Sequence, residues 1–387
     1  MIRMTFEFAT ATRIVFGSGA ISQSAPAACE MGSRILVVSG RSPARANLLI
    51  SRLQSAGMQT ATFPIDGEPT VNIVREGVAR AREHKADVIA AIGGGSAIDA
   101  GKAIAAVLAN GGDPMDYLEV VGAGKPLRVP STPFIAIPTT AGTGSEVTRN
   151  AVLGSPEHKV KASLRSPLML PKLAIVDPEL TLDLPPAITA STGLDALTQL
   201  IEPYVCSRAN PMTDLFCVEG MRRVARSLRR AFEDGRSREA REDMALASLL
   251  GGLSLANAGL GVVHGFAAPV GGMYPAPHGA VCAALLPHGI AVNIRALRER
   301  APQAEALRRY ETVARILTGK DDAKPETAVD WVTETCERLQ IPRLRTYGME
   351  VSHIETIVDK ASRASSMKAN PIPLTPAELT DVLRRAL

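Results

Sequence analysis

Residues 88–108 read VIAAIGGGSAIDAGKAIAAVL. The first five are apolar, with the length and branching of a strand that is buried on both faces. Large apolar side chains then recur at helical spacing, at Ile98, Ile104 and Val107. Three adjacent glycines between the two patterns allow a close chain reversal. The stretch therefore predicts a strand, a glycine turn and a helix, which is the repeating unit of an α/β sheet.

This turn is also a candidate anion site. Free backbone N–H groups at a helix start, together with the helix dipole, favour a phosphate group. A tight turn that binds nothing is the open alternative. The stretch lacks the G-x-G-x-x-G fingerprint, and it is not a Walker A loop, because Ser96 and Ala103 stand where that motif needs Gly and Ser or Thr. The sequence therefore argues against an ATPase mechanism.

The flanking sequence repeats the alternation of strands and helices. We expect helices over 44–56 and 71–85, and strands at two short runs within 6–16 and at 35–38, 59–63, 134–137 and 173–176. This order predicts a Rossmann-like α/β domain with a largely parallel sheet over residues 1–182. Ligands of such sheets bind beyond the carboxyl ends of the strands, where Gly40, the triple glycine and Thr139–Thr140 all lie.

After Leu184-Pro185-Pro186 the pattern changes to long helical stretches rich in Ala, Leu and Arg. Runs of β-branched residues nearly vanish. The sequence therefore predicts an all-α domain over residues 183–387, and a chain of 387 residues is long enough for two cores.

Composition excludes several classes of function. The net charge is +4, the basic residues are dispersed, and aromatic residues make up only 4% of the chain, which argues against a nucleic-acid surface. The five cysteines are scattered without a C-x-x-C pair, so we expect buried thiols in a reducing compartment and neither disulfides nor a thiolate zinc site. No signal peptide or membrane span is indicated at the N-terminus, so a cytoplasmic protein is expected.

Residues 139–146, TTAGTGSE, place hydroxyls and glycines at a second strand end. Thr and Ser hydroxyls donate to phosphate and ribose oxygens, and glycine keeps the loop thin. The alternative is a turn followed by a helix N-cap. From residue types alone the two interpretations are about even.

Three of the six histidines fall within 264–288, in a glycine-rich stretch. Imidazole is a common ligand for divalent metals. Asp195 and Gln199 are four residues apart on a predicted helix and share one face. With His264 and His278 they could close around one cation. The alternative is a capping Asp195 and satisfied core histidines, which spacing alone favours because no H-E-x-x-H motif is present.

Taken together, these motifs resemble the iron-containing (group III) alcohol dehydrogenase family. The resemblance covers GGGSAIDAGK, PTTAGTGSEVT, AIVDPELT, STGLDALTQLIEPY, HGFAAPVGGMYPAPHG and LLPHGIAVN, nearly from end to end and in order. It implies NAD or NADP as cofactor, iron or zinc as metal, and a homodimer. The positions that match cofactor contacts are Gly94, Gly95, Ser96, Thr139, Thr140, Thr143 and Ser145, with Asp99 in the same motif, Gly40 at the loop after the second strand and Lys161 near the nicotinamide ribose. The four metal-ligand positions are Asp195, Gln199, His264 and His278.

Three departures from the family pattern bear on function. Gln199 replaces the usual second histidine ligand, and an amide oxygen is a weak, neutral donor. Ala268 stands where many members have a further histidine. Without that histidine the substrate pocket lacks a side-chain acid, so no catalytic residue is assigned. The loop Ser39–Ser42 has no carboxylate to repel a 2′-phosphate and carries Arg41, which indicates that NADP is tolerated. A solvated Arg41 is the alternative.

The function expected from the sequence is an NAD(P)-dependent, metal-assisted oxidoreductase that interconverts a small alcohol and its aldehyde or ketone by direct hydride transfer. Gln199 keeps open the alternative of a metal-independent enzyme resembling maleylacetate reductase. A nucleotide-binding protein without catalysis is the third hypothesis. Metal analysis and an aldehyde screen would separate the three.

Overall fold

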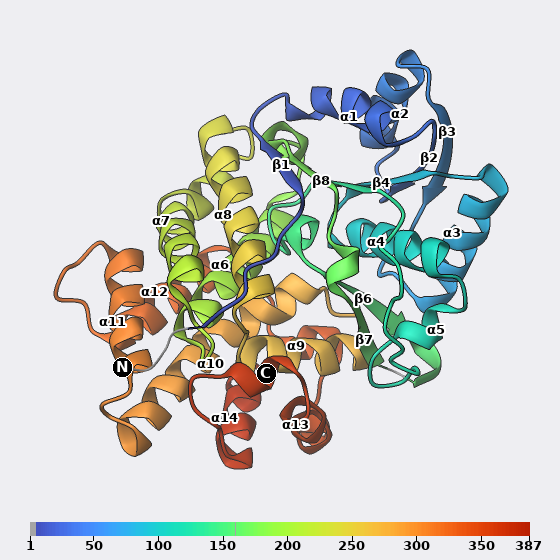
Figure 1. Cartoon of the computed structure of the whole chain (residues 1–387). Coiled ribbons are helices and arrows are strands. Elements are labelled where there is room, and N and C mark those ends of the chain that lie inside the picture. Colours follow the sequence, from blue (N-terminus) through green and yellow to red (C-terminus); the bar gives the residue numbers. More distant parts are fainter. Residues whose placement is uncertain (1–4, 159) are drawn as a thin grey trace. The chain divides into compact units, whose positions relative to one another are not determined.

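The computed structural model describes residues 5–158 and 160–387 (Figure 1). By its internal contacts the chain divides into two units. One consists of residues 9–140 and 144–182, and the other of residues 183–387 together with residues 5–8 and 141–143. The second unit therefore includes two short segments from the first half of the chain.

The first unit is built on a parallel six-stranded sheet in the order β1-β8-β5-β4-β2-β3. Its strands are β1 (Arg13–Phe16), β2 (Arg34–Ser39), β3 (Gln59–Pro64), β4 (Val88–Gly93), β5 (Phe134–Pro138) and β8 (Leu173–Val176). The parallel register aligns Ser39 with Ile92 and Gly93 with Pro138. The carboxyl ends of β2, β4 and β5 therefore meet at one edge of the sheet.

Both faces of this sheet are buried. On β4, Ile89 and Ala91 belong to the core cluster that contains residues of α3 (Val71–His84) and α4 (Gly95–Asn110). Val88, Ala90 and Ile92 belong to the opposite cluster, with α1 (Ser24–Met31) and α2 (Pro43–Ser55). Successive side chains of β4 thus point alternately into the two core clusters. Because both clusters are apolar, every residue of the strand is apolar, as in other parallel sheets covered on both faces. The expected α/β fold with a parallel sheet is confirmed.

Two local details differ from the sequence expectations. Only one strand, β1, forms within residues 6–16, because Phe8 packs against Phe216 of the helical unit at a ring distance of 5.7 Å and does not extend the sheet. An antiparallel hairpin of β6 (Asn150–Ser155) and β7 (Val160–Arg165) was not expected. Burial alternates at every position of β6, and apolar and polar residues alternate along β7, so a strand signal was present in the sequence and was missed.

From Asp183 to Leu387, every named element of the second unit is a helix. The α-helices are α6 (Pro186–Val205), α7 (Pro211–Glu233), α8 (Arg238–Asn257), α9 (Val262–Met273), α10 (His278–Arg300), α11 (Glu305–Thr318), α12 (Pro325–Arg338), α13 (Ile354–Ser362) and α14 (Pro376–Ala386). The expected helical second half is confirmed. A further short helix, α5 (Pro114–Tyr117), belongs to the first unit.

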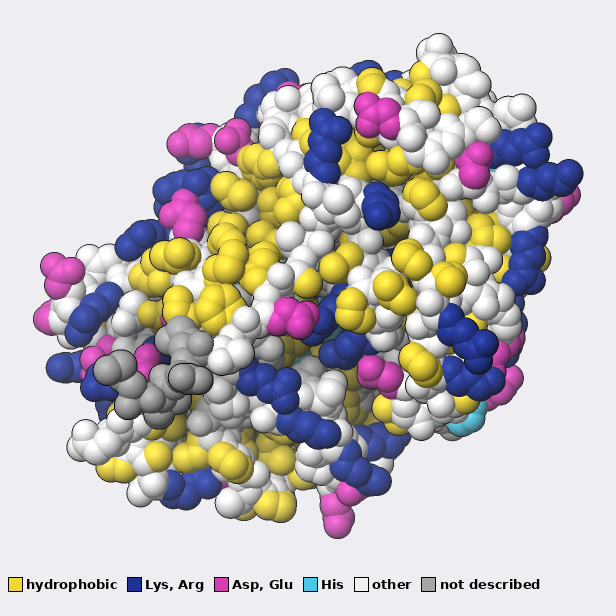
Figure 2. Space-filling view, in the orientation of Figure 1, with side chains coloured by type: hydrophobic (Ala, Val, Ile, Leu, Met, Phe, Trp, Pro, Cys, Tyr) yellow, Lys and Arg dark blue, Asp and Glu magenta, His cyan; other side chains and the backbone are white. Residues whose placement is uncertain are grey.

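One helix of the described chain, α10, is long and apolar enough by itself to cross a membrane, and the bent pair α8–α9 passes the same test only as one broken span. In α10, 83% of the apolar window is buried inside the protein. Core helices of globular units have this property, and α10 is one of them. Figure 2 shows basic and acidic side chains interspersed over the face drawn, in agreement with the dispersed charge of the sequence.

Candidate metal centre and nucleotide loops

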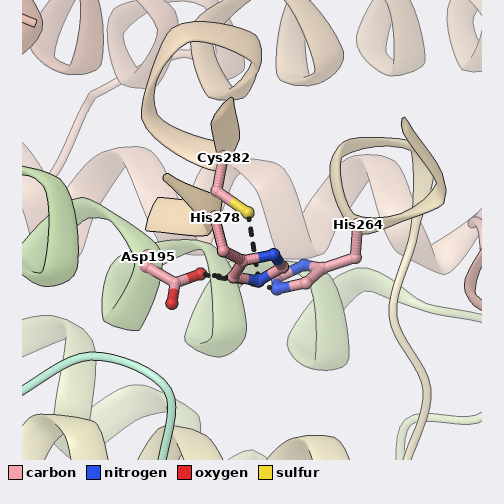
Figure 3. Close-up of side chains that lie close together, drawn as sticks. All are labelled: Asp195, His264, His278 and Cys282. Carbon is pink, nitrogen blue, oxygen red and sulfur yellow. Dashed lines mark hydrogen bonds and ion pairs between the residues drawn. The ribbon is translucent and has the colours of Figure 1, made fainter. Parts of the chain in front are cut away.

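Four side chains from three helices of the helical unit converge on one point (Figure 3). They are Asp195 of α6, His264 of α9, and His278 and Cys282 of α10. One ligand atom from each lies within 4.8 Å of every other. The Asp195 Oδ1 atom is 3.6 Å from the Nε2 atoms of both histidines. The structure thus brings together three of the four metal positions predicted from the sequence.

The cluster is enclosed on most sides. The side chains of Asp195 and His264 are 1% and 6% exposed, whereas that of His278 is 36% exposed. Asp195 lies in the middle of the long α6 helix, and His278 is the first residue of α10. The cluster is therefore most exposed at His278.

Glu202 orients His264. It lies on α6, seven residues after Asp195, so the two carboxylates share one face of the helix. The His264 Nδ1–H donates to Glu202 Oε2 at 2.7 Å, and the backbone N–H of Val263 donates to Oε1 at 2.7 Å. This leaves the His264 Nε2 lone pair directed at the cluster, an arrangement typical of metal-binding histidines. A carboxylate at the N-terminus of α9 also complements the helix dipole.

Glu202 was missed by the sequence analysis, although the spacing of Asp195, Gln199 and Glu202 at i, i+4 and i+7 was a signal for it. Gly261, the N-cap of α9, leaves room for the carboxylate. A Cβ atom at Gly261 would lie 2.8 Å from Glu202 Oε1 and 2.9 Å from Asn370 Oδ1.

The residues fit a divalent cation. Both carboxylate oxygens of Asp195, the Nε2 of His264 and the amide oxygen of Gln199 are buried and have no hydrogen-bond partner. Burying a carboxylate without a partner costs several kcal/mol or more, so these atoms point to a missing positive charge. Carboxylate and imidazole are suitable donors for zinc and iron.

The electrostatics of the cluster also favour positive charge. Burial lowers the pKa of His278, but the neighbouring Cys282 and Asp195 outweigh it and raise the pKa to about 9. The same groups raise the pKa of His264 against the effect of burial. Burial raises the pKa of Asp195, yet the charges of the two histidines bring it below its usual value. The cluster therefore stabilises added positive charge.

Gln199 remains a predicted ligand, whereas Cys282 differs from what the sequence indicated. The Gln199 amide oxygen is 3.6 Å from the position that a Cβ atom would occupy on Gly251 of α8. Cys282 was expected to be an ordinary buried thiol because the chain has no C-x-x-C pair, whereas the structure places it in the cluster. The available signal was its position four residues after His278 on one helix face.

In the α/β unit, four of the predicted cofactor residues meet at the carboxyl ends of β2, β4 and β5. The Gly40 N–H donates to Ile92 O at 3.3 Å, and the Thr139 N–H donates to Gly93 O at 2.8 Å. A Cβ atom on Gly94 would lie 3.4 Å from the Thr140 methyl group. These contacts bring Gly40, Gly94, Thr139 and Thr140 together.

The start of α4 has the features of an anion site. Gly94 is its N-cap and provides no side-chain cap, and Gly95 and Ser96 are its first residues. The first turn contains no acidic side chain. Its backbone N–H groups therefore face the edge of the sheet without an internal acceptor, as a bound phosphate requires. A Cβ atom on Gly93 would lie 2.6 Å from the Ala97 Cβ, so the turn needs glycine there.

Asp99 and Ser145 take part in a buried network around Lys102. The Lys102 ammonium donates to Ser145 O at 2.8 Å, Thr148 Oγ1 at 2.8 Å and Asn150 O at 2.7 Å. The Ser145 hydroxyl donates to Asp99, whose other oxygen accepts the Val152 N–H at 2.9 Å. Burial lowers the Lys102 pKa to about 8 despite Asp99 and Glu146 nearby. The network ties α4 to the loop that follows β5.

The two remaining predicted cofactor residues are Lys161 and Thr143. Lys161, on β7, is only 10% exposed and forms an ion pair with Glu68 at 3.3 Å, so it is not an ordinary surface lysine. Thr143 lies in the segment that clusters with the helical unit. Arg41, after β2, pairs with Asp66 beyond β3. Asp66 is a carboxylate near the Arg41 loop that the sequence analysis did not consider.

Comparison with known proteins identifies the family. The family profile for iron-containing alcohol dehydrogenases matches residues 11–178, and that for the C-terminal part of the Fe-containing alcohol dehydrogenase family matches residues 189–387. The chain belongs to the iron-containing alcohol dehydrogenase family. The chain is 37% identical over 338 residues to the 1,3-propanediol dehydrogenase of Klebsiella pneumoniae, an alignment that covers 86% of this chain and 85% of that protein.

Solved structures agree with this family assignment. A crystal structure of 1,3-propanediol oxidoreductase superposes with a TM-score of 0.92 at 33% identity, covering 99% of this chain and 100% of the other. The sulfoacetaldehyde reductase of Bifidobacterium kashiwanohense, solved in complex with NAD⁺, gives 0.86 at 28% identity, with 99% and 98% covered.

The family resemblance stated from the sequence is thus confirmed. The chain is an oxidoreductase of the alcohol dehydrogenase type, and members of its family use NAD(H) and a divalent metal. The metal-independent alternative is not favoured, because the relatives are alcohol and propanediol dehydrogenases.

Proposed function

We propose that this alcohol dehydrogenase reduces a small aldehyde or ketone, or oxidises the corresponding alcohol, by metal-assisted direct hydride transfer. The observation that carries the proposal is the convergence of Asp195, His264 and His278, in which the buried donor atoms of Asp195 and His264 have no hydrogen-bond partner. When bound by these side chains, a divalent cation supplies Lewis acidity toward the substrate oxygen.

The chain's own residues orient the reactants. Glu202 holds His264 with its Nε2 toward the site, and the exposed side of His278 is the entry for substrate. The backbone N–H groups of Gly94, Gly95 and Ser96 bind the cofactor pyrophosphate at the N-terminus of α4. Thr139, Thr140 and Thr143 supply hydroxyl donors to the cofactor. Asp99, Ser145 and Lys102 hold the loop in place, and Lys161 lies near the nicotinamide ribose.

The substrate proton has no side-chain donor in this proposal. Ala268 is four residues after His264 on α9, on the same helix face, and it carries no titratable group. We propose that solvent or a ribose hydroxyl exchanges the proton. The pH profile of kcat is therefore expected to show no titration of an imidazole at position 268.

The decisive experiment combines metal analysis with one substitution. We expect about one equivalent of zinc or iron per chain, loss of aldehyde reduction after dialysis against a chelator, and recovery when the metal is restored. His264→Ala should lower kcat/KM by at least about two to three orders of magnitude, because the metal loses one of its ligands. His84→Ala, in the α/β unit, is the matched control. Full activity of the metal-stripped wild type would refute the proposal.

The cofactor preference is a separate proposal. NAD is the expected cofactor and NADP is tolerated, because Arg41 can reach a 2′-phosphate while Asp66 competes for its charge. The ratio of kcat/KM for NADPH and NADH measures this preference, and Asp66→Asn should raise it.

We also propose a cytoplasmic homodimer whose functional domains are residues 1–182 and 183–387. Sedimentation velocity tests the dimer.

A further inference from the structure

We propose that the Cys282 thiolate is the fourth protein ligand of the cation, and that the site is selective for zinc. This inference rests on the metal site proposed above. It adds a sulfur donor to Asp195, His264 and His278, and it makes the amide of Gln199 unnecessary as a ligand.

The distances match a tetrahedral site. The Cys282 Sγ atom is 3.7 Å from His278 Nε2, and Asp195 Oδ1 is 3.6 Å from each histidine Nε2. Tetrahedral zinc with bonds of about 2.0 Å to nitrogen or oxygen and about 2.3 Å to sulfur places its donors roughly 3.3–3.6 Å apart. Three of the six donor-to-donor distances are therefore close to those of a zinc tetrahedron, and all six are within 4.8 Å. A substrate oxygen would enter as a fifth ligand, as catalytic zinc allows.

The position of Cys282 on α10 supports a ligand role. His278 and Cys282 are separated by one helical turn, so both side chains leave the same face. Figure 3 shows the sulfur directed toward the imidazoles, and Cys282 is fully buried. Its sulfur therefore lies inside the cluster and not along its rim.

Other thiols of the chain have a different environment. The Cys206 thiol donates to Pro203 O at 3.3 Å, and the Cys336 thiol donates to Ala283 O at 3.5 Å. The Cys282 sulfur instead faces an imidazole nitrogen at 3.7 Å. A buried thiol with only a packing role does not need an imidazole nitrogen beside its sulfur. A thiolate among two imidazoles and a carboxylate is a donor set of the kind zinc prefers.

The donor set also has the charge that zinc requires. One thiolate and one carboxylate neutralise Zn²⁺, and the two neutral imidazoles complete four ligands. Zinc binding releases the thiol proton to solvent. Because sulfur is a softer donor than the amide oxygen of Gln199, a thiolate site selects zinc over harder cations such as Mg²⁺ or Mn²⁺.

The test is X-ray absorption at the zinc edge on the zinc-loaded full chain. We expect one sulfur scatterer at about 2.3 Å together with nitrogen or oxygen scatterers. The Co²⁺-substituted protein should show a thiolate-to-metal charge-transfer band in the near ultraviolet. Cys282→Ser should lose both signals, whereas the control Cys206→Ser, which keeps a hydrogen-bond donor for Pro203 O, should retain them.

The outcomes separate this inference from the proposed function. Bound zinc with only nitrogen and oxygen scatterers in the wild type would overturn the role of Cys282 and leave the metal-assisted mechanism standing. No zinc binding by the wild type would overturn both. If Cys282→Ser does not fold, the wild-type spectrum still decides, because Cys282 is the cysteine in the described cluster.

Discussion

Glu202 supports the candidate metal site without being one of the converging donors. Its carboxylate accepts the His264 Nδ1–H and the Val263 N–H, both at 2.7 Å. A hydrogen-bonded carboxylate raises the basicity of the imidazole and holds its orientation. His264 thus acts as a directed donor because of a residue on a different helix, α6.

We therefore expect Glu202→Gln to weaken metal binding by roughly 10–100-fold while the chain still folds. Competition against a chromophoric chelator measures the dissociation constant. Glu219→Gln, on the exposed part of α7, is the control and should leave it unchanged. An unchanged constant in Glu202→Gln would show that His264 needs no partner to bind the metal.

At the level of elements, the helix α4 and the loop after β5 are joined through buried charge. Lys102 and Glu146 are 0% and 2% exposed. Burial raises the pKa of Glu146 to about 7, in spite of Lys102 nearby. The folded state therefore binds a proton at this carboxyl more tightly than the unfolded chain does, for which the reference value is 4.5.

The sign of the pH dependence follows from these two pKa values. The contribution of Glu146 to stability is complete below about pH 4.5 and is lost as the pH rises through about 7. Between pH 5 and pH 7 the wild type should lose about 2 kcal/mol of unfolding free energy relative to Glu146→Gln. Urea unfolding at the two pH values measures it, with the exposed Glu83→Gln as control. Parallel pH profiles for the wild type and Glu146→Gln would contradict the expectation.

At the scale of the whole molecule, a cation at the cluster joins three helices of the helical unit. Asp195, His264 and His278 come from α6, α9 and α10, so an ion bound to all three stabilises the folded chain over the unfolded one. At a free zinc concentration of 100 times the dissociation constant, the gain is about 2.7 kcal/mol.

We expect zinc to raise the Tm of the apoprotein by several degrees in differential scanning calorimetry. His264→Ala should reduce this rise strongly, and His353→Ala, whose ring packs against Tyr274 outside the cluster, should not. A Tm that is insensitive to zinc in the wild type would argue against a site formed by these helices.

The sequence by itself determined the α/β sheet and the helical second half. The reason is that an apolar strand, a triple glycine and helical periodicity are local patterns, each readable within some twenty residues. Asp195, His264 and His278 were assigned through a family resemblance, because their spacing alone favoured ordinary core roles.

Only the tertiary structure decided which side chains surround the predicted ligands. Glu202 and Cys282 share helix faces with Asp195 and His278, which is a local signal, but which helices and loops meet around them depends on tertiary packing. The Lys102 network depends on that packing too. The missing strand before β1 has the same cause, since this short segment takes its conformation from a distant partner, Phe216. These contacts join residues that are far apart in the sequence, so they form only when the chain folds and cannot be read from a local pattern.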